Sequence, residues 1–110
     1  MDIRISNATD ISVVEVQGKL DTTTANQFQQ ELFKLIEAGT VKIIIDATHL
    51  SYVSSAGLRV LLASGKKIKA NGGKIVLCNI NEMIREVLDI SGFAPLFPTF
   101  HTREDAIKGF

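Results

Sequence analysis

The sequence predicts an α/β domain built on a mixed β-sheet of four or five strands, with about four helices. Three observations carry this prediction. Short runs rich in Val and Ile alternate along the chain with segments whose apolar residues recur at helical spacing. The first two runs are joined by a few turn-forming residues, which favours an antiparallel pair, whereas helical segments separate the later runs and favour parallel pairing. The run Val41–Ile45 is apolar almost throughout, which is typical of a strand covered on both faces.

The chain opens with two predicted strands, Ile3–Ser6 and Ile11–Gln17, joined by turn-forming residues 7–10. The residues after the second strand lead through Thr22–Thr24 into the first predicted helix. Gly39 ends this helix, because glycine adopts the left-handed conformation that stops a helix at little cost. One stripe of the helix is apolar and consists of Ala25, Phe28, Leu32, Leu35 and Ile36.

A third predicted strand, Lys42–Asp46, and a second helix are joined by a polar loop that ends in two serines. The second helix ends near the turn Asn71–Gly73, and a fourth strand, Lys74–Cys78, follows it. Strand–helix–strand connections of this kind cross over in the right-handed sense. The apolar residues of the second helix recur at helical spacing and include Leu58, Leu61, Leu62, Gly65 and Ile68.

The last third of the chain predicts a third helix that begins near Asn81 and ends at Gly92. A short edge strand follows at Leu96–Phe100, where Pro98 is tolerated because one side of an edge strand is unpaired. Thr102 is the predicted N-cap of a final short helix. The spacing of the third helix places its apolar residues together on one side, namely Ile80, Met83, Ile84, Val87 and Leu88.

Ser54 and Ser55 lie at the corner where the third strand gives way to the second helix. A serine at such a corner can cap the helix through its hydroxyl, and the free N–H groups and the helix dipole stabilise a negative charge there. A phosphate on Ser55 would therefore meet an anion-binding helix end. Considered alone, such a serine is more often a cap than a regulatory site, so the residues by themselves leave both roles open.

Polar residues follow three of the predicted strands, at Asp21, Ser54–Gly57 and Asn79. Sites in open α/β sheets gather beyond the carboxyl ends of the strands, so we expect these residues to converge on one site. Asp46 closes the third predicted strand, and we expect its carboxylate to accept hydrogen bonds that fix the following loop.

Length and apolar pattern limit the class of protein. A chain of 110 residues suits one domain with its own core. No apolar run approaches the length of a membrane span, and Met1–Ile5 lacks the pattern of a secretory signal, so we expect no membrane insertion. The single cysteine, Cys78, can form no internal disulfide and is expected to be a small buried side chain, which suits a cytoplasmic protein.

The charges argue against a nucleic-acid binder, because 12 basic residues balance 12 acidic ones and such binders depend on neutralising phosphates. One group of lysines does cluster, and we interpret it as the solvated end of the second helix. This group consists of Lys66, Lys67, Lys69 and Lys74.

The residue types of a hydrolase triad are present in His49, His101, Asp46 and Ser55. The serine lacks the Gly-x-Ser-x-Gly elbow, however, because Val53 stands two residues before it. Two histidines and one cysteine also show no metal-ligand spacing, and no glycine-rich phosphate loop is present. We therefore expect no enzymatic activity, no metal and no cofactor.

The segment 46–58 closely resembles the signature of anti-sigma factor antagonists, the small single-domain members of the STAS superfamily. Their pattern is an Asp closing a strand, an aromatic residue, a short apolar–Asp–Ser–Ser/Ala–Gly–Leu segment and then a helix. Ser54 replaces the acidic residue of that pattern, which removes one negative charge and leaves Ser55 in the register of the phosphorylated serine. The segment Val16–Asp21 similarly resembles the family's strand-end Gly-x-Leu/Ile-Asp. The direct matches are Asp46, Tyr52, Val53, Ser55, Ala56, Gly57 and Leu58.

The resemblance implies that residues 1–110 form a single STAS domain that acts by partner switching. It implies that the unphosphorylated chain binds a serine-kinase anti-sigma factor, that this kinase phosphorylates Ser55 with ATP and magnesium, and that a PP2C-type phosphatase resets the chain. By the same resemblance we expect a monomer without direct contact to nucleic acid. The alternative is a STAS accessory subunit that docks on the ATPase of a lipid-transport ABC complex, where the serine need not be phosphorylated.

Several residues of the expected site have two interpretations. Asp21 either stabilises a helix start or, as the resemblance implies, orients the partner or the phosphate. Gly57 either admits another backbone or packs tightly against the sheet of its own domain. Tyr52 is expected to be a half-buried packing residue, and Arg59 an exposed cation that reaches an acidic partner. The predicted partner-binding residues are Asp21, Thr22, Thr23, Ser54, Ser55, Ala56, Gly57, Leu58 and Arg59.

Overall fold

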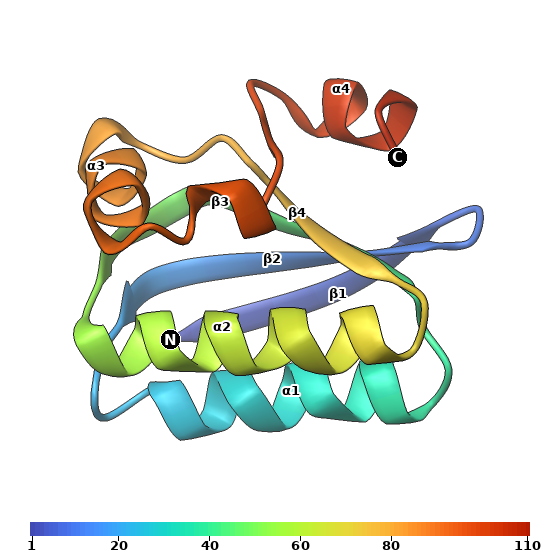
Figure 1. Cartoon of the computed structure of the whole chain (residues 1–110), viewed down its shortest axis with the longest axis horizontal. Helices are drawn as coiled ribbons and strands as arrows, with labels where there is room; N and C mark the ends of the chain where they lie inside the picture. Colours follow the sequence, from blue (N-terminus) through green and yellow to red (C-terminus); the bar gives the residue numbers. More distant parts are fainter.

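A five-stranded mixed sheet forms the centre of the computed structural model, which describes all 110 residues (Figure 1). The strands lie in the order β1-β2-β3-β4-β5; β1 and β2 pair antiparallel and all other pairs are parallel. The α/β class, the mixed sheet and the number of helices predicted from the sequence are confirmed. The elements are β1 Asp2–Ala8, β2 Ile11–Leu20, α1 Ala25–Glu37, β3 Lys42–Val53, α2 Ser55–Ala70, β4 Lys74–Cys78, α3 Glu82–Ser91, a 3-10 turn Ala94–Leu96, β5 Thr99–Phe100 and α4 Arg103–Lys108.

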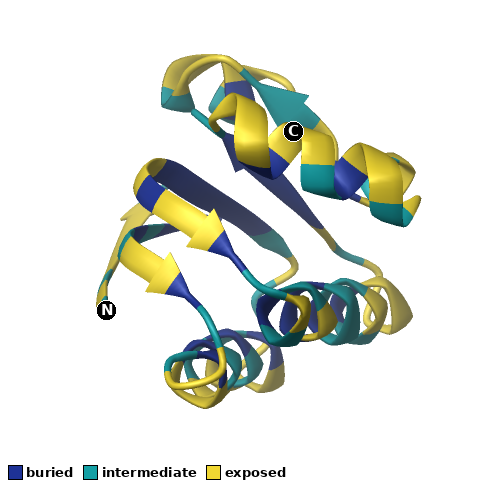
Figure 2. Ribbon diagram, turned by 90° about the vertical axis from the view of Figure 1, so that its left-hand side faces the viewer, coloured by how far each residue is buried: buried dark blue, intermediate teal, exposed yellow.

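Helices cover both faces of the sheet (Figures 1 and 2). Side chains alternate between the faces along each strand, so Val14 and Val16 of β2 enter the larger core under α1 and α2. Ile11 and Val13 point to the other face, where α4 covers a smaller cluster that contains Ala106. No helix has the length and apolar character needed to cross a bilayer.

Helix α3 closes one end of the larger core against β3. Its Ile84 and Leu88 are buried, but Met83, which the spacing places on the same side, is 49% exposed. The apolar side of α3 is therefore wider than the face that the protein covers. Asn81 caps the helix by accepting the Ile84 N–H at 2.8 Å, and Gly92 ends it in the left-handed conformation with φ 79°, as predicted.

Three strands are longer than the sequence predicts. β1 spans Asp2–Ala8 instead of Ile3–Ser6, so residues 7 and 8 belong to the strand and not to the turn. β2 continues to Leu20 and β3 to Val53, so Asp46 lies within β3 rather than at its end. The polar residues in the extensions of β2 and β3 break the apolar pattern. The two strands nevertheless pair with each other there, so their backbone N–H and C=O groups are hydrogen-bonded. Two register shifts accompany the extension, opposite Glu15–Gln17 and Gly18–Lys19 of β2, and at each of them β3 contributes one residue more than β2.

β5 is shorter than the predicted segment Leu96–Phe100 and consists of only two residues. Leu96 instead ends the 3-10 turn. The Pro98 carbonyl accepts the Leu77 N–H at 2.9 Å, but proline has no N–H to continue the ladder toward the start of β4. The strand is therefore confined to Thr99–Phe100.

Candidate functional site

The carboxyl ends of β2 and β3 lie side by side and bring two groups of candidate residues to one surface. Leu20 and Val53 are register partners, and the Ser54 N–H donates to the Leu20 carbonyl oxygen at 2.9 Å. The residue after Leu20 therefore emerges beside the start of α2. We call the surface formed by residues 21–23 and 54–59 the serine corner.

The two serines at the start of α2 differ in role. Ser54 is the N-cap: its backbone is extended, with φ −86° and ψ 176°, and its Oγ accepts the Gly57 N–H at 3.2 Å. Ser55 is the first residue of the helix, is exposed, and its hydroxyl makes no hydrogen bond within the chain. The capping role that the sequence allowed for Ser55 therefore belongs to Ser54, and the Ser55 hydroxyl remains accessible to another protein.

The first turn of α2 presents free backbone donors. The Leu58 N–H donates to the Ser54 carbonyl at 2.9 Å, and the cap uses the Gly57 N–H. The N–H groups of Ser55 and Ala56 have no acceptor within the chain. Because such donors and the helix dipole stabilise an anion, a negative charge on Ser55 would be favoured here.

Asp21 orders the turn that leads into α1. Its Oδ1 accepts the Thr23 hydroxyl at 2.7 Å and the Thr23 N–H at 2.9 Å, while the Asp21 N–H donates to Thr24 Oγ1 at 2.9 Å. The hydrogen bonds from the Thr23 side chain and backbone hold the pKa of Asp21 below its usual value. The carboxylate is therefore charged at neutral pH, and its Oδ2 makes no hydrogen bond within the chain. Its structural role in the turn is compatible with a second role toward a partner.

Gly57 is a contact point between α2 and the end of β2. A Cβ at this position would lie 2.7 Å from Leu20 Cγ and 2.9 Å from the Leu20 carbonyl oxygen. Gly57 is also buried. Of its two interpretations, tight packing against the sheet of its own domain is therefore the one that the geometry supports.

The other residues of the serine corner differ in exposure. Thr22, Thr23 and Arg59 are exposed, whereas Ala56 and Leu58 are half-buried and pack against the larger core. Arg59 follows Ser55 by four positions and therefore lies on the same side of α2. It makes no ion pair within the chain. Tyr52, at 41% exposed, is more open than a half-buried packing residue.

Asn79 does not join the serine corner. Its Nδ2 donates to Asp46 Oδ1 at 3.3 Å, and β3 extends from Asp46 through Val53 before the corner begins. The expected convergence of three strand ends is thus reduced to two, because β4 ends opposite the middle of β3.

Asp46 instead forms a network on the face covered by α4. Its Oδ1 accepts the Thr48 hydroxyl at 2.6 Å, and its Oδ2 accepts Arg103 Nε at 3.0 Å and Nη2 at 2.8 Å. Arg103 Nη2 also lies 3.1 Å from Glu15 Oε2, and Glu15 is the register partner of Asp46 on β2. The network thus holds two neighbouring carboxylates with one cation. Arg103 gives no signal in the sequence, because its role depends on the register of β2 and β3.

The pKa of Asp46 reflects opposing effects. Burial raises it, but the hydrogen bonds from Thr48, Arg103 and Asn79 outweigh burial and keep the pKa below its usual value. Asp46 accepts hydrogen bonds from the residues that follow it, as predicted, but these residues belong to β3 and not to a loop. Through Arg103 it also anchors α4. The residue types of a hydrolase triad do not form a triad: Asp46 has these partners, and His49 and His101 are exposed and make no hydrogen bond to Ser55. No group of three potential metal-ligating side chains lies together.

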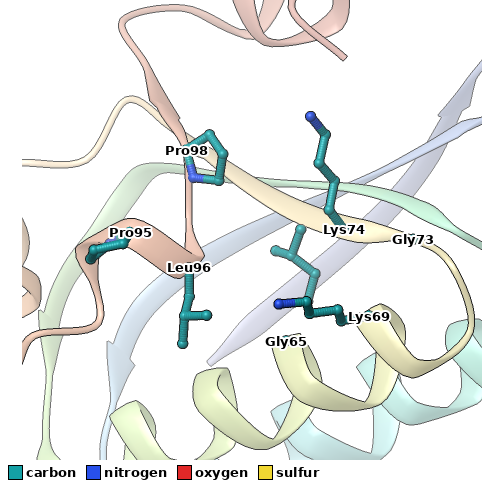
Figure 3. Close-up of a pocket in the computed structure, with 8 residues that line it drawn as sticks. Gly65, Lys69, Gly73, Lys74, Pro95, Leu96 and Pro98 are labelled. Atoms are coloured by element: carbon teal, nitrogen blue, oxygen red, sulfur yellow. The ribbon is translucent and has the colours of Figure 1, made fainter.

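A groove of about 230 Å³ lies at the other end of α2. Figure 3 shows Lys69, Lys74 and Leu96 around it, with Gly65 in its floor. Gly65 lies ten residues beyond Ser55, which places the groove roughly 15 Å along the helix from the serine corner. The groove is therefore not part of the corner.

The lysine cluster is only partly solvated. Lys66 and Lys69 are exposed, whereas Lys67 pairs with Glu37 at 3.5 Å and lies 5.0 Å from the centre of the Phe33 ring. The interpretation as a solvated helix end thus holds for part of the group.

Comparison with known proteins finds relatives along nearly the whole chain. A family model described as STAS domain matches residues 2–106. The chain is 38% identical to BtrV of Bordetella bronchiseptica over 86% of this chain and 82% of that protein. It is 33% identical to the anti-sigma-B factor antagonist of Bacillus subtilis over 93% of this chain and 92% of that protein.

The solved structures of SpoIIAA, an anti-sigma factor antagonist of Bacillus, have the same fold. The unphosphorylated form superposes with a TM-score of 0.84 over 99% of this chain and 98% of that one. The phosphorylated form superposes with a TM-score of 0.78 over 98% of both chains. Both are 25% identical to this chain in sequence.

Proposed function

The chain belongs to the STAS domain family and, within it, to the anti-sigma factor antagonists, and on this basis we propose that it works as a partner switch controlled by Ser55. In this proposal the unphosphorylated chain binds a serine-kinase anti-sigma factor through the serine corner, which frees the sigma factor. The kinase then transfers the γ-phosphate of ATP to the Ser55 hydroxyl, ADP leaves, and the modified chain is released. A PP2C-type phosphatase restores the hydroxyl by hydrolysis.

The division of roles between the two serines is the observation that supports this proposal most strongly. The Ser54 hydroxyl is committed to the cap, whereas the Ser55 hydroxyl is exposed and free of hydrogen bonds. A kinase can therefore modify Ser55 without breaking the helix cap. The fold also resembles SpoIIAA in both its phosphorylated and its unphosphorylated forms.

Release follows from local electrostatics. A phosphate adds about −1.5 to −2 charges at pH 7, and a desolvated interface cannot hydrate that charge. The free N–H groups of Ser55 and Ala56 and the dipole of α2 stabilise the phosphate in the free chain. Phosphorylation therefore weakens binding while the domain stays folded.

The transporter alternative has no structural observation in its favour. The named relatives described above are antagonists, and nothing in the serine corner requires a permanent partner.

The first experiment tests the switch residue directly. The cognate kinase and magnesium–ATP should label the unmodified chain and Ser54→Ala, but not Ser55→Ala. Phosphate mapped to Ser54 by mass spectrometry would contradict the proposed register.

The second experiment measures affinity for the kinase by calorimetry. Ser55→Ala should bind as tightly as the unmodified chain, and phosphoserine at position 55 should weaken binding at least tenfold, which corresponds to ~1.4 kcal/mol. Ser55→Asp carries a single charge on a shorter side chain, so it should weaken binding less than the phosphate does. Equal affinity of all these forms would count against partner switching itself.

A further inference from the structure

Helix α3 carries apolar side chains beyond the face that the protein covers. Ile84 and Leu88 pack into the larger core and are 3% and 2% exposed. Met83 and Ile90 are 49% and 80% exposed, and Val87 between them is half-buried. Ile90 is the most exposed of all the large apolar side chains in the molecule.

These three residues form one stripe. Successive residues of an α-helix are about 100° apart, so Met83, Val87 and Ile90 fall within an arc of roughly 60°. Their spacing of four and three positions is the pattern with which helices contact other helices. Single exposed apolar residues are common on protein surfaces, but an aligned stripe indicates a contact surface. We call this set the α3 stripe.

An acidic row runs along the α3 stripe. Glu82, Glu86 and Asp89 each precede a residue of the stripe by one position, so they form a parallel row on the neighbouring side of the helix. All three are exposed, and none takes part in an ion pair. The whole chain has a formal net charge of zero, so this accumulation is local.

We propose that the α3 stripe and its acidic row are a docking surface for an amphipathic helix of a partner protein, with an apolar face and a flank of lysine or arginine. The stripe provides apolar area, and the acidic row selects a basic flank by charge complementarity. Arg85, the one cation of α3, donates to Thr99 Oγ1 of β5 at 3.4 Å. A second copy that met this surface with its own α3 would therefore bring a second acidic row against the first. The charges therefore favour a different protein as the occupant.

The proposed surface is independent of the phosphoserine. α3 and the start of α2 lie at the same end of the molecule, the end that faces the viewer in Figure 2. Asn81 Nδ2 donates to the Leu50 carbonyl of β3 at 3.4 Å, so the start of α3 is fixed to the strand that leads to the serine corner. No residue of the α3 stripe or of its acidic row belongs to the serine corner, so the proposal stands without the partner switch.

The test uses the full chain and two synthetic helical peptides of about five turns. One peptide places leucines on one face and lysines along its flanks, and the other has glutamate at every lysine position. Amide shifts in ¹H–¹⁵N spectra report the binding site. We expect the lysine peptide to shift the amides of α3 and the glutamate peptide to leave them unchanged. Ile90→Ser and Glu86→Lys should each weaken binding of the lysine peptide at least fivefold.

Ile5→Ser is the matched control, because Ile5 is 40% exposed on β1 and lies outside α3; it should bind like the unmodified chain. Circular dichroism establishes that each variant is folded. Equal binding of both peptides, shifts centred away from α3, or no binding of either peptide at millimolar concentration would overturn the proposal. If the α3 amides shift with protein concentration in the absence of peptide, the stripe is a contact between copies of this chain, and the proposal is overturned.

Discussion

At the scale of single residues, the two adjacent serines of the serine corner differ: Ser54 caps α2, and the hydroxyl of Ser55, the proposed phosphorylation site, makes no hydrogen bond. The acidic residue that the family pattern has before the switch serine is Ser54 here, and both aspartate and serine are good N-caps. The replacement therefore keeps the helix cap while removing one negative charge beside Ser55. With one negative charge fewer at the start of α2, the charge that phosphorylation adds to Ser55 should change the local electrostatic potential by a larger fraction.

The cap can be tested by stability. We expect Ser54→Ala to lower the free energy of unfolding by about 1 kcal/mol, because the Gly57 N–H loses its acceptor. Ser55→Ala should change it by less than ~0.5 kcal/mol, because the Ser55 hydroxyl makes no hydrogen bond. Denaturant unfolding followed by circular dichroism measures both. A larger loss in Ser55→Ala than in Ser54→Ala would contradict the capping assignment.

Arg59 should interact with a phosphate on Ser55, because residues four apart on a helix are neighbours. A nearby cation favours the dianion and lowers the second pKa of the phosphoserine, which is ordinarily about 6. We expect Arg59→Gln to raise the ³¹P titration midpoint by about 0.3 pH unit, which corresponds to ~0.4 kcal/mol. Lys66→Gln, on the same helix but far from Ser55, is the control and should leave the midpoint unchanged.

At the scale of elements, the close packing of α2 on β2 sets the position of the corner. The Leu20 carbonyl accepts the Ser54 N–H and also lies where a Cβ of residue 57 would be. A larger residue at position 57 would therefore move α2 away from the end of β2. A loss of binding in such a variant would follow from a change in the fold, not from a lost partner contact.

We accordingly expect Gly57→Ala to destabilise the domain by about 1–2 kcal/mol, since overpacking outweighs the gain in helix propensity. Gly65→Ala is the matched control in the same helix, because its Cβ would meet only the outer edge of the Phe97 ring, at 3.1 Å. Phe97 is 1% exposed, so the ring must shift slightly within the core, and we expect a smaller loss of stability than in Gly57→Ala. Thermal unfolding of both variants checks the comparison.

Arg103 joins α4 to the sheet. Arg103→Gln leaves Asp46 buried without its cation and places it beside Glu15, and we expect a loss of about 2–3 kcal/mol. This loss of stability is smaller than that expected for a fully buried ion pair, because the Arg103 side chain is 35% exposed. Lys108→Gln, at the exposed end of α4, should have no effect and serves as the control.

The same network makes stability depend on pH. The pKa of Asp46 is lower in the folded than in the unfolded chain, so its contribution is present above the unfolded pKa of about 3.9. It is lost as the pH falls through the folded pKa. Removing the Arg103 hydrogen bonds raises the folded pKa, so Arg103→Gln should unfold at a higher pH than the unmodified chain in an acid titration. An unchanged acid midpoint would contradict this account.

At the scale of the whole molecule, two apolar clusters on opposite faces of the sheet hold the domain together. Cys78 lies in the smaller cluster, fully buried, next to α4. Burial, with a smaller effect of the Asp46 charge, raises the pKa of the Cys78 thiol to about 12. The thiol therefore stays protonated while the smaller cluster is intact.

Alkylation of Cys78 should thus report opening of that face. At pH 8 we expect iodoacetamide to label the native chain at least about a thousandfold more slowly than the unfolded chain, because the thiolate is the nucleophile. The rate should rise with denaturant in parallel with global unfolding. Rapid labelling of the native chain would show instead that α4 opens by itself.

Much of the architecture follows from local patterns in the sequence. The alternation of strands and helices, the helix start near Asn81, the cap at Thr102 and the stop at Gly92 depend on interactions within a few residues, and the structure confirms them. The assignment of Ser55 as the phosphorylated residue comes instead from the resemblance of a short motif and stays a prediction. The confirmed features depend on short-range interactions. These features were predictable since propensity, capping and turn formation act between near neighbours.

Only the tertiary structure decided how distant segments meet. The polar end of β3 is a strand because β2 pairs with it, Gly57 is required because Leu20 lies against it, and Arg103 joins carboxylates 57 and 88 positions away. The α3 stripe is exposed although its spacing matches that of buried residues, because only the packing of α3 on β3 selects the covered face. A linear pattern records which residues share a side of an element. Whether another element covers that side depends on contacts between residues far apart in the chain.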